Sequence, residues 1–236
     1  MAKNGKIPLI LLPCLAGDRV LWEAQIAALG DVADVVVADL TRSDSMAGMA
    51  RDVLDAAPAK FAMAGLSMGG YASFEIMRQA GERVSKLALL DTSARPDTPE
   101  QTVARRDLIS LCERGEFKGV TPRVLPRWIH QSRLNDQALV TVVTEMIRRV
   151  GKEAFVRQQT AIMRRPDSRP GLSRVRCPTL VLCGRQDQST PLEHSLEQAA
   201  DIPNSRLVVI EECGHLSSME RPDEVARAMR AWLTED

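Results

Sequence analysis

The chain has 236 residues, of which 44% are hydrophobic and 26% charged, a balance typical of a globular protein with one large domain and room for a small insertion. Its formal net charge is zero, which argues against a protein that binds nucleic acid by neutralising phosphates. The five cysteines show neither metal-binding nor redox spacing, and no apolar stretch reaches the length of a membrane span. We therefore expect free thiols, no membrane association and a cytoplasmic location.

Short apolar runs alternate with amphipathic segments along the chain. The runs are expected to form strands at 7–12, 35–38, 61–64, 87–90, 179–183 and 207–210, and the segments to form helices at 20–29, 46–57, 70–80, 192–200 and 222–233. The apolar runs are continuous, as in strands buried on both faces of a parallel sheet. The pattern predicts an α/β fold with a mostly parallel, six-stranded, doubly wound sheet.

The interval 96–170 departs from this alternation, because it contains only helical segments, around 100–112, 126–130, 136–150 and 153–163. An insertion before the penultimate strand would lie over the carboxyl ends of the strands, where open α/β sheets bind ligands. We therefore expect a core domain formed by residues 1–95 and 171–236 and a helical cap formed by residues 96–170.

The predicted cap is basic, with 14 Lys and Arg against 9 Asp and Glu. A basic cap over a ligand site would favour anionic substrates or an acidic carrier protein. The alternative is that these arginines are the solvated faces of amphipathic helices. The sequence leaves both interpretations open.

The segment Gly65-Leu66-Ser67-Met68-Gly69 follows an apolar run and opens a predicted helix, which is the pattern of a nucleophile elbow. A sharp turn of this kind needs very small residues two positions before and after the serine, and Gly65 and Gly69 meet that demand. The turn exposes the Ser67 hydroxyl and directs the backbone N–H of Met68 toward the carbonyl that would be attacked. The segment thus predicts a nucleophile and one half of an oxyanion hole.

A serine nucleophile needs a base, and the chain has three histidines. His215 follows the last predicted strand, so it lies at the same sheet edge as Ser67 and is the expected base. His194 falls in a predicted helix and is expected on the surface. His130 belongs to the cap, where it could at most contact substrate.

The histidine in turn needs a carboxylate that fixes its tautomer. Asp187 follows the strand predicted at 179–183 and is the preferred partner, whereas a turn or capping role is favoured for Asp91. The order Ser67, Asp187, His215 is the chain order of triads built on a nucleophile elbow.

Four segments carry a resemblance that covers essentially the whole chain: 11–18 with the following Trp22, 65–70, 182–187 and 214–215. With them the chain resembles the small α/β-hydrolases, close to carboxylesterases, 3-oxoadipate enol-lactonases and pimeloyl-carrier methyl ester esterases. The resemblance implies that the N–H of Leu15 donates the second oxyanion hydrogen bond. Many relatives have glycine where this chain has Cys14, and we expect this difference to adjust the oxyanion hole slightly.

The resemblance and the three residues together predict a serine hydrolase that cleaves small or medium-chain carboxylic esters through an acyl-enzyme, without metal or cofactor. One alternative is a lactonase acting on a carboxylate-bearing ring, and perhydrolysis or haloperoxidation is a variant of the same site. Another is a ligand-binding protein that keeps the fold without turnover. Candidates for an apolar substrate pocket are Leu15, Trp22, Leu66, Met68, Trp128 and Met163, with His130 beside them. Ordinary packing in the core is an equally favoured interpretation of each apolar candidate.

Overall fold

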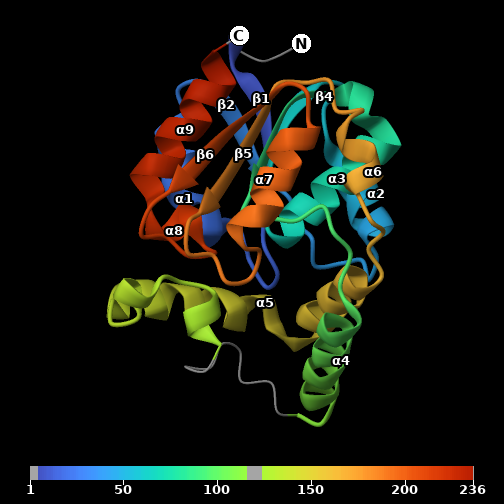
Figure 1. Cartoon of the computed structure of the whole chain (residues 1–236), viewed down its shortest axis with the longest axis vertical. Helices are drawn as coiled ribbons and strands as arrows, with labels where there is room; N and C mark the ends of the chain where they lie inside the picture. The colour runs from blue at the N-terminus through green and yellow to red at the C-terminus, as the bar shows by residue number, and fades with distance from the viewer. Residues whose placement is uncertain (1–4, 116–123, 236) are drawn as a thin grey trace.

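In the computed structural model, which describes residues 5–115 and 124–235, six parallel strands form one sheet in the order β2-β1-β3-β4-β5-β6 (Figure 1). The strands are β1 (Ile7–Leu12), β2 (Ala33–Val37), β3 (Phe61–Leu66), β4 (Val84–Leu90), β5 (Thr179–Gly184) and β6 (Ser205–Ile210). The chain builds the sheet in one direction from β1 to β2 and in the other from β3 onward. Ligand crevices of open α/β sheets form at such a reversal, outside the carboxyl ends of the strands.

Burial differs between central and edge strands. Every residue of β3 and β5 is buried, as predicted from their continuous apolar runs. The edge strands β2 and β6 are only partly covered, and Val36 in β2 is 61% exposed. The prediction of burial on both faces was wrong for these two strands, because each has a hydrogen-bonded neighbour on one side only.

Two layers of helices cover the sheet. Alternate residues of β1 point to opposite faces, so that Leu9 and Leu11 join one hydrophobic cluster and Ile10 and Leu12 join the other. The helices α1 and α9 pack together, as do α2 and α3. The helices outside the cap are α1 (Glu23–Leu29), α2 (Met46–Ala56), α3 (Met68–Ala80), α6 (Arg169–Leu172), α7 (Leu192–Asp201), α8 (Ser217–Glu220) and α9 (Pro222–Thr234), with 3₁₀ turns at Arg19–Trp22 and Gly81–Arg83.

The inserted segment is helical in the described residues, as predicted. Its main helices are α4 (Pro99–Glu113), which begins with a capping box of Thr98 and Gln101, and α5 (Gln137–Met163), which is broken at Gly151 by a φ of 81°. The helix predicted at 126–130 is replaced by two 3₁₀ turns, Leu125–Arg127 and Gln131–Arg133. Figure 1 shows α4 and α5 beyond the carboxyl ends of the strands. The division into core and cap domains agrees with this arrangement and stays a prediction.

Most arginines described in the cap are paired. Ion pairs hold, among others, Arg133 to Asp136, Arg148 to Glu145, Arg149 to Asp18 and Arg169 to Asp167. Of the basic residues counted in the sequence, Lys118 and Arg123 lie outside the described residues. Many of the positive charges at the surface of the cap therefore lie next to a carboxylate.

Two further observations concern the described chain as a whole. Its five cysteines are all free thiols. No helix in residues 5–115 or 124–235 combines the length and the apolar character that crossing a membrane requires.

Candidate active site

Ser67 occupies the turn between β3 and α3 with φ 55° and ψ −112°, a backbone conformation that residues other than glycine rarely adopt. Its N–H donates to the Leu90 carbonyl, and its own carbonyl accepts from the Thr92 hydroxyl and from Gly70 N–H. These bonds tie the turn to β4 on one side and to the helix on the other. The Ser67 side chain is thereby held at the carboxyl edge of the sheet.

Two glycines permit this turn. A methyl group on Gly65 would overlap the backbone of Gly69, and one on Gly69 would overlap the carbonyl of Leu12 at the end of β1. The start of α3 therefore lies directly against the loop that follows β1. This contact brings the N-terminus of the helix next to the segment that contains Leu15.

The structure brings the three predicted side chains into one hydrogen-bonded line. His215 Nε2 lies 2.8 Å from Ser67 Oγ, and His215 Nδ1 lies 2.7 Å from Asp187 Oδ2. A carboxylate can only accept, so the neutral imidazole carries its proton on Nδ1 and offers the Nε2 lone pair to the Ser67 hydroxyl. All three side chains are buried.

Asp187 is held by its own turn. Its Oδ1 accepts from the N–H groups of Ser189 and Thr190 at 2.7 and 3.0 Å, and its Oδ2 also accepts from the Thr190 hydroxyl at 2.7 Å. Burial alone would raise the pKa of Asp187, but the charge and hydrogen bond of His215, together with the two hydrogen bonds from Thr190, hold the pKa below its usual range. For His215, burial alone would lower the pKa, and the charge and hydrogen bond of Asp187 raise it above its usual range.

The candidate oxyanion donors flank Ser67. Met68 begins α3 immediately after Ser67, and Leu15 lines the same cavity as the Ser67 side chain. In the loop that contains Leu15, Ala16 has left-handed backbone with a φ of 53°, whereas the φ of Cys14 is not positive. The strain considered for a cysteine at this position is therefore absent. Ala16 N–H donates at 2.8 Å to Gln158 of α5, which anchors the loop to the cap.

The loop that carries His215 is joined to the cap as well. The Trp128 carbonyl accepts from the N–H groups of both His215 and Leu216. The buried Glu220 carboxylate accepts from His130 N–H at 2.6 Å and from Gly214 N–H at 3.0 Å. The cap segment around Trp128 and the His215 loop therefore form one hydrogen-bonded unit.

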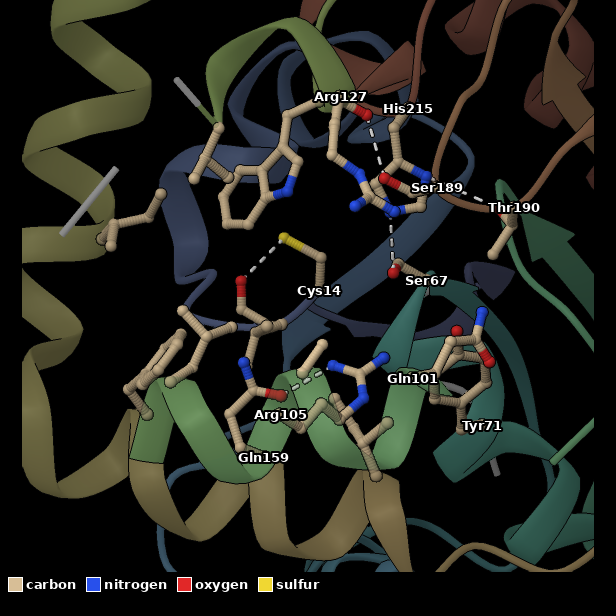
Figure 2. Close-up of a pocket in the computed structure, with 18 of the residues that line it drawn as sticks. Cys14, Ser67, Tyr71, Gln101, Arg105, Arg127, Gln159, Ser189, Thr190 and His215 are labelled. Atoms are coloured by element: carbon tan, nitrogen blue, oxygen red, sulfur yellow. Dashed lines mark hydrogen bonds between the residues drawn. The ribbon is translucent and has the colours of Figure 1, made fainter. Parts of the chain in front are cut away.

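A cavity of about 810 Å³ opens over Ser67 and His215, between the sheet edge and the cap. Figure 2 shows Ser67, His215 and Thr190 together on one side of it. Its apolar lining is supplied largely by the inserted segment, through Leu108, Leu111, Val124, Trp128, Ile147, Phe155 and Ile162. Predominantly apolar walls with a few polar groups are typical of a small-molecule site.

Comparisons with known proteins agree with this geometry. A model of the Alpha/beta hydrolase family matches residues 9–228. The chain is 34% identical to a malate-bound thermophilic esterase from Thermogutta terrifontis, and the superposition covers 97% of this chain and 90% of that one with a TM-score of 0.90. The chain belongs to the alpha/beta hydrolase family.

Two other relatives are more distant. The enol-lactonase from Burkholderia xenovorans LB400 is 26% identical to this hydrolase, with a TM-score of 0.89 over 99% of this chain and 94% of that one. The 2-hydroxy-6-oxononadienedioate/2-hydroxy-6-oxononatrienedioate hydrolase of Escherichia coli K12 is 29% identical over 80% of this chain and 68% of its own length.

Several residues predicted to line the substrate pocket of the hydrolase lie elsewhere. Leu15 and Trp128 line the cavity, but Trp22, Leu66, Met68, His130 and Met163 do not. Trp22 and Leu66 are fully buried in the core between the sheet and its helices. His130 pairs with Ser132 through Nδ1, and at the end of α5 Ile162 faces the cavity in place of Met163.

Asp91 and His194 also differ from expectation. Asp91 does not cap its own turn: it is fully buried with φ 44°, and its carboxylate accepts from Gly184 N–H and from the Ser217 N–H and hydroxyl, joining β5 to α8. Burial, followed by the charge of Asp187, raises the pKa of Asp91 to about 8. His194 is half-buried, and its Nδ1 has no partner among the described residues.

Sequence reasoning missed Thr190, Gln158 and Glu220, whose hydrogen bonds hold Asp187 and the loops that carry Leu15 and His215. The spacing from Asp187 to Thr190 could have identified the first, because an aspartate commonly bonds the backbone two or three residues onward. Gln158 and Glu220 act across large sequence separations, and no local pattern marks them.

Proposed function

We propose that this hydrolase cleaves small or medium-chain carboxylic esters, with Ser67 as nucleophile, His215 as general base and Asp187 as the carboxylate that orients it. The observation that carries the proposal is the continuous hydrogen-bonded line from Asp187 through His215 to Ser67, ending in an apolar cavity. The similarity to the Thermogutta terrifontis esterase supports it.

The proposed reaction is acyl transfer to water. Ser67 attacks the ester carbonyl while His215 Nε2 takes the hydroxyl proton, and Asp187 stabilises the resulting imidazolium. The N–H groups of Met68 and Leu15 donate to the tetrahedral oxyanion, and each such donor contributes about 3 kcal/mol. His215 then returns its proton to the leaving alcohol. A water molecule activated by His215 releases the acid from Ser67.

Lactone hydrolysis is the second candidate. It uses the same steps, except that the leaving alcohol stays attached to the acyl group. The likeness to the Burkholderia xenovorans enol-lactonase favours it, as does an arginine, Arg105, on the cavity wall. The non-hydrolytic interpretation rested on Cys14 alone, and the ordinary backbone of that residue weakens it.

Hydrolysis of p-nitrophenyl acetate and butyrate, compared with 3-oxoadipate enol-lactone, tests the proposal. We expect turnover of the aryl esters and a loss of about 10⁴-fold or more in kcat for Ser67→Ala and His215→Gln. His194→Gln is the matched control and should keep the wild-type rate. Turnover of the lactone alone would favour the second candidate, and full ester hydrolysis by Ser67→Ala would contradict both.

A further inference from the structure

A polar cluster interrupts the apolar wall of the cavity. Arg105 of α4 donates from Nε to Asp97 Oδ2 at 2.6 Å and from Nη1 to Gln159 Oε1 of α5, also at 2.6 Å. Asp97 Oδ1 accepts from Arg165 at 2.6 Å. Only Arg105 and Gln159 of this cluster line the cavity. Figure 2 shows these two side chains next to each other on the cavity wall below Ser67.

The cluster holds more positive than negative charge. The Asp97 side chain is 1% exposed and is shared by two guanidinium groups, those of Arg105 and Arg165. Arg165 does not line the cavity; its guanidinium lies 4.2 Å from the centre of the Tyr71 ring and donates to the carbonyls of Arg95 and Ile162. Asp97 can neutralise only one of the two guanidinium groups, so one positive charge remains. Arg105 is the member of the pair that carries this charge at the cavity wall.

Two hydrogen-bond donors of the cluster are unused. The Gln159 oxygen accepts from Arg105, so the amide NH₂ must point elsewhere, and it has no partner within residues 5–115 and 124–235. Gln159 is nevertheless only 1% exposed. Arg105 Nη2 likewise makes no hydrogen bond to any described residue. A nearly buried amide donor beside an arginine, both on a cavity wall, is a site built for an acceptor that the protein itself does not supply.

The chemistry of the donors selects the acceptor. The free groups, a guanidinium N–H and an amide NH₂, are both hydrogen-bond donors and lie next to a net positive charge. A carboxylate matches them, because it has two acceptor oxygens and a negative charge. Other charged residues on the cavity lining are Glu100 and Asp107, exposed on α4, and Arg127, exposed near Ser189. None of them bonds to Arg105 or Gln159.

We propose that Arg105 and Gln159 form a carboxylate subsite, so that the preferred substrates are esters that carry a carboxylate away from the scissile bond. This inference rests on the proposed ester hydrolysis and names its substrate class. It also assigns a specificity role to one cap arginine, while five of the other cap arginines described form ion pairs at the surface.

Matched substrate pairs test the subsite and locate the carboxylate. Mono-p-nitrophenyl adipate against its methyl ester places the charge on the acyl side, and 4-(butanoyloxy)benzoate against its methyl ester places it on the alcohol side. We expect the wild type to prefer the charged member of one pair by about tenfold or more in kcat/KM, mainly through KM, as for a hydrogen bond to a charged group. Equal kcat/KM within both pairs would overturn the proposal.

Variants of Arg105 and Gln159 test whether these two residues cause the preference for charged substrates. Arg105→Gln should reduce it by about tenfold, and Gln159→Glu should reduce it at least as far, because a carboxylate replaces the free amide donor while an acceptor for Arg105 remains. Arg106→Gln is the matched control, since Arg106 is exposed on the same helix and lies outside the cavity lining. A preference that survives both Arg105→Gln and Gln159→Glu would contradict the assignment, and thermal melting of each variant checks the fold.

A binding measurement separates this inference from the proposed function. Calorimetric titration of the wild type should show adipate binding more tightly than its uncharged analogue adipamide, and Arg105→Gln should abolish the difference. If the wild type cleaves no ester but binds adipate through Arg105, the proposed function fails and the subsite stands. If esters are cleaved without regard to charge and adipate does not bind, the subsite fails and the esterase stands.

Discussion

His215 is the residue at which opposing electrostatic effects meet. Burial disfavours its protonated form, while the Asp187 carboxylate in contact with Nδ1 favours it, and the net pKa lies above the ordinary value of 6.5. The carboxylates of Asp91 and Glu220 act in the same direction from farther away. Burial and the charge of Asp187 raise the pKa of Asp91 to about 8, and among the carboxylates Asp187 has the largest effect on His215.

This balance predicts the pH dependence of ester hydrolysis. The protonated imidazole cannot accept the Ser67 proton, so kcat/KM for a neutral aryl ester should fall as the pH drops through the raised pKa of His215. Half-maximal activity is therefore expected above pH 6.5, the ordinary histidine value. A pH–rate profile of the wild type measures this midpoint.

Asp187→Asn provides the matching test. It removes the charge that raises the pKa of His215 and leaves the burial that lowers it, so the midpoint should move to lower pH, while kcat falls by about 10⁴-fold. A midpoint that stays in place or moves upward would show that Asp187 does not control the titration of His215.

Among the elements, the turn between β3 and α3 depends on close approach to β1. A methyl group on Gly69 would overlap the Leu12 carbonyl, and backbone cannot yield as a flexible side chain can. Gly69→Ala should therefore destabilise the fold by about 2 kcal/mol, a shift of about 4–8 °C in Tm for a chain of this size. It should also reduce activity, because the turn positions Ser67.

Gly171→Ala is the control for this element. Gly171 lies in α6, and a methyl group there would meet no atom within 4 Å. Thermal unfolding followed by circular dichroism compares the two variants. Equal Tm values for Gly69→Ala and Gly171→Ala would refute the argument that close backbone contact holds the turn.

For the molecule as a whole, sequence patterns predicted the sheet better than the cavity. Apolar runs located all six strands, yet the start of β4 at Val84 was missed because Ser85 and Lys86 interrupt its apolar run. The partial exposure of β2 was missed because an apolar run does not reveal that its strand lies at an edge.

In the site, too, some residues could be predicted from the sequence and others could not. Ser67, Asp187 and His215 could be selected because each follows a strand at the same sheet edge, where topology alone brings them near one another. The cavity wall comes from helices inserted far along the chain, so the pairing of Arg105 with Gln159 leaves no local sequence signal. Trp22 and Leu66 were candidates for the pocket but are buried in the core, because an apolar residue in the sequence does not show whether it faces a cavity or the core.

The most direct test of the account is covalent labelling of the whole protein with a fluorophosphonate, which reacts with activated serine hydroxyls. Mass spectrometry should find a single adduct on the peptide that contains Ser67, and none in Ser67→Ala. Wild-type protein that remains unlabelled, or an adduct that persists in Ser67→Ala, would contradict the claim that His215 and Asp187 activate Ser67 as a nucleophile.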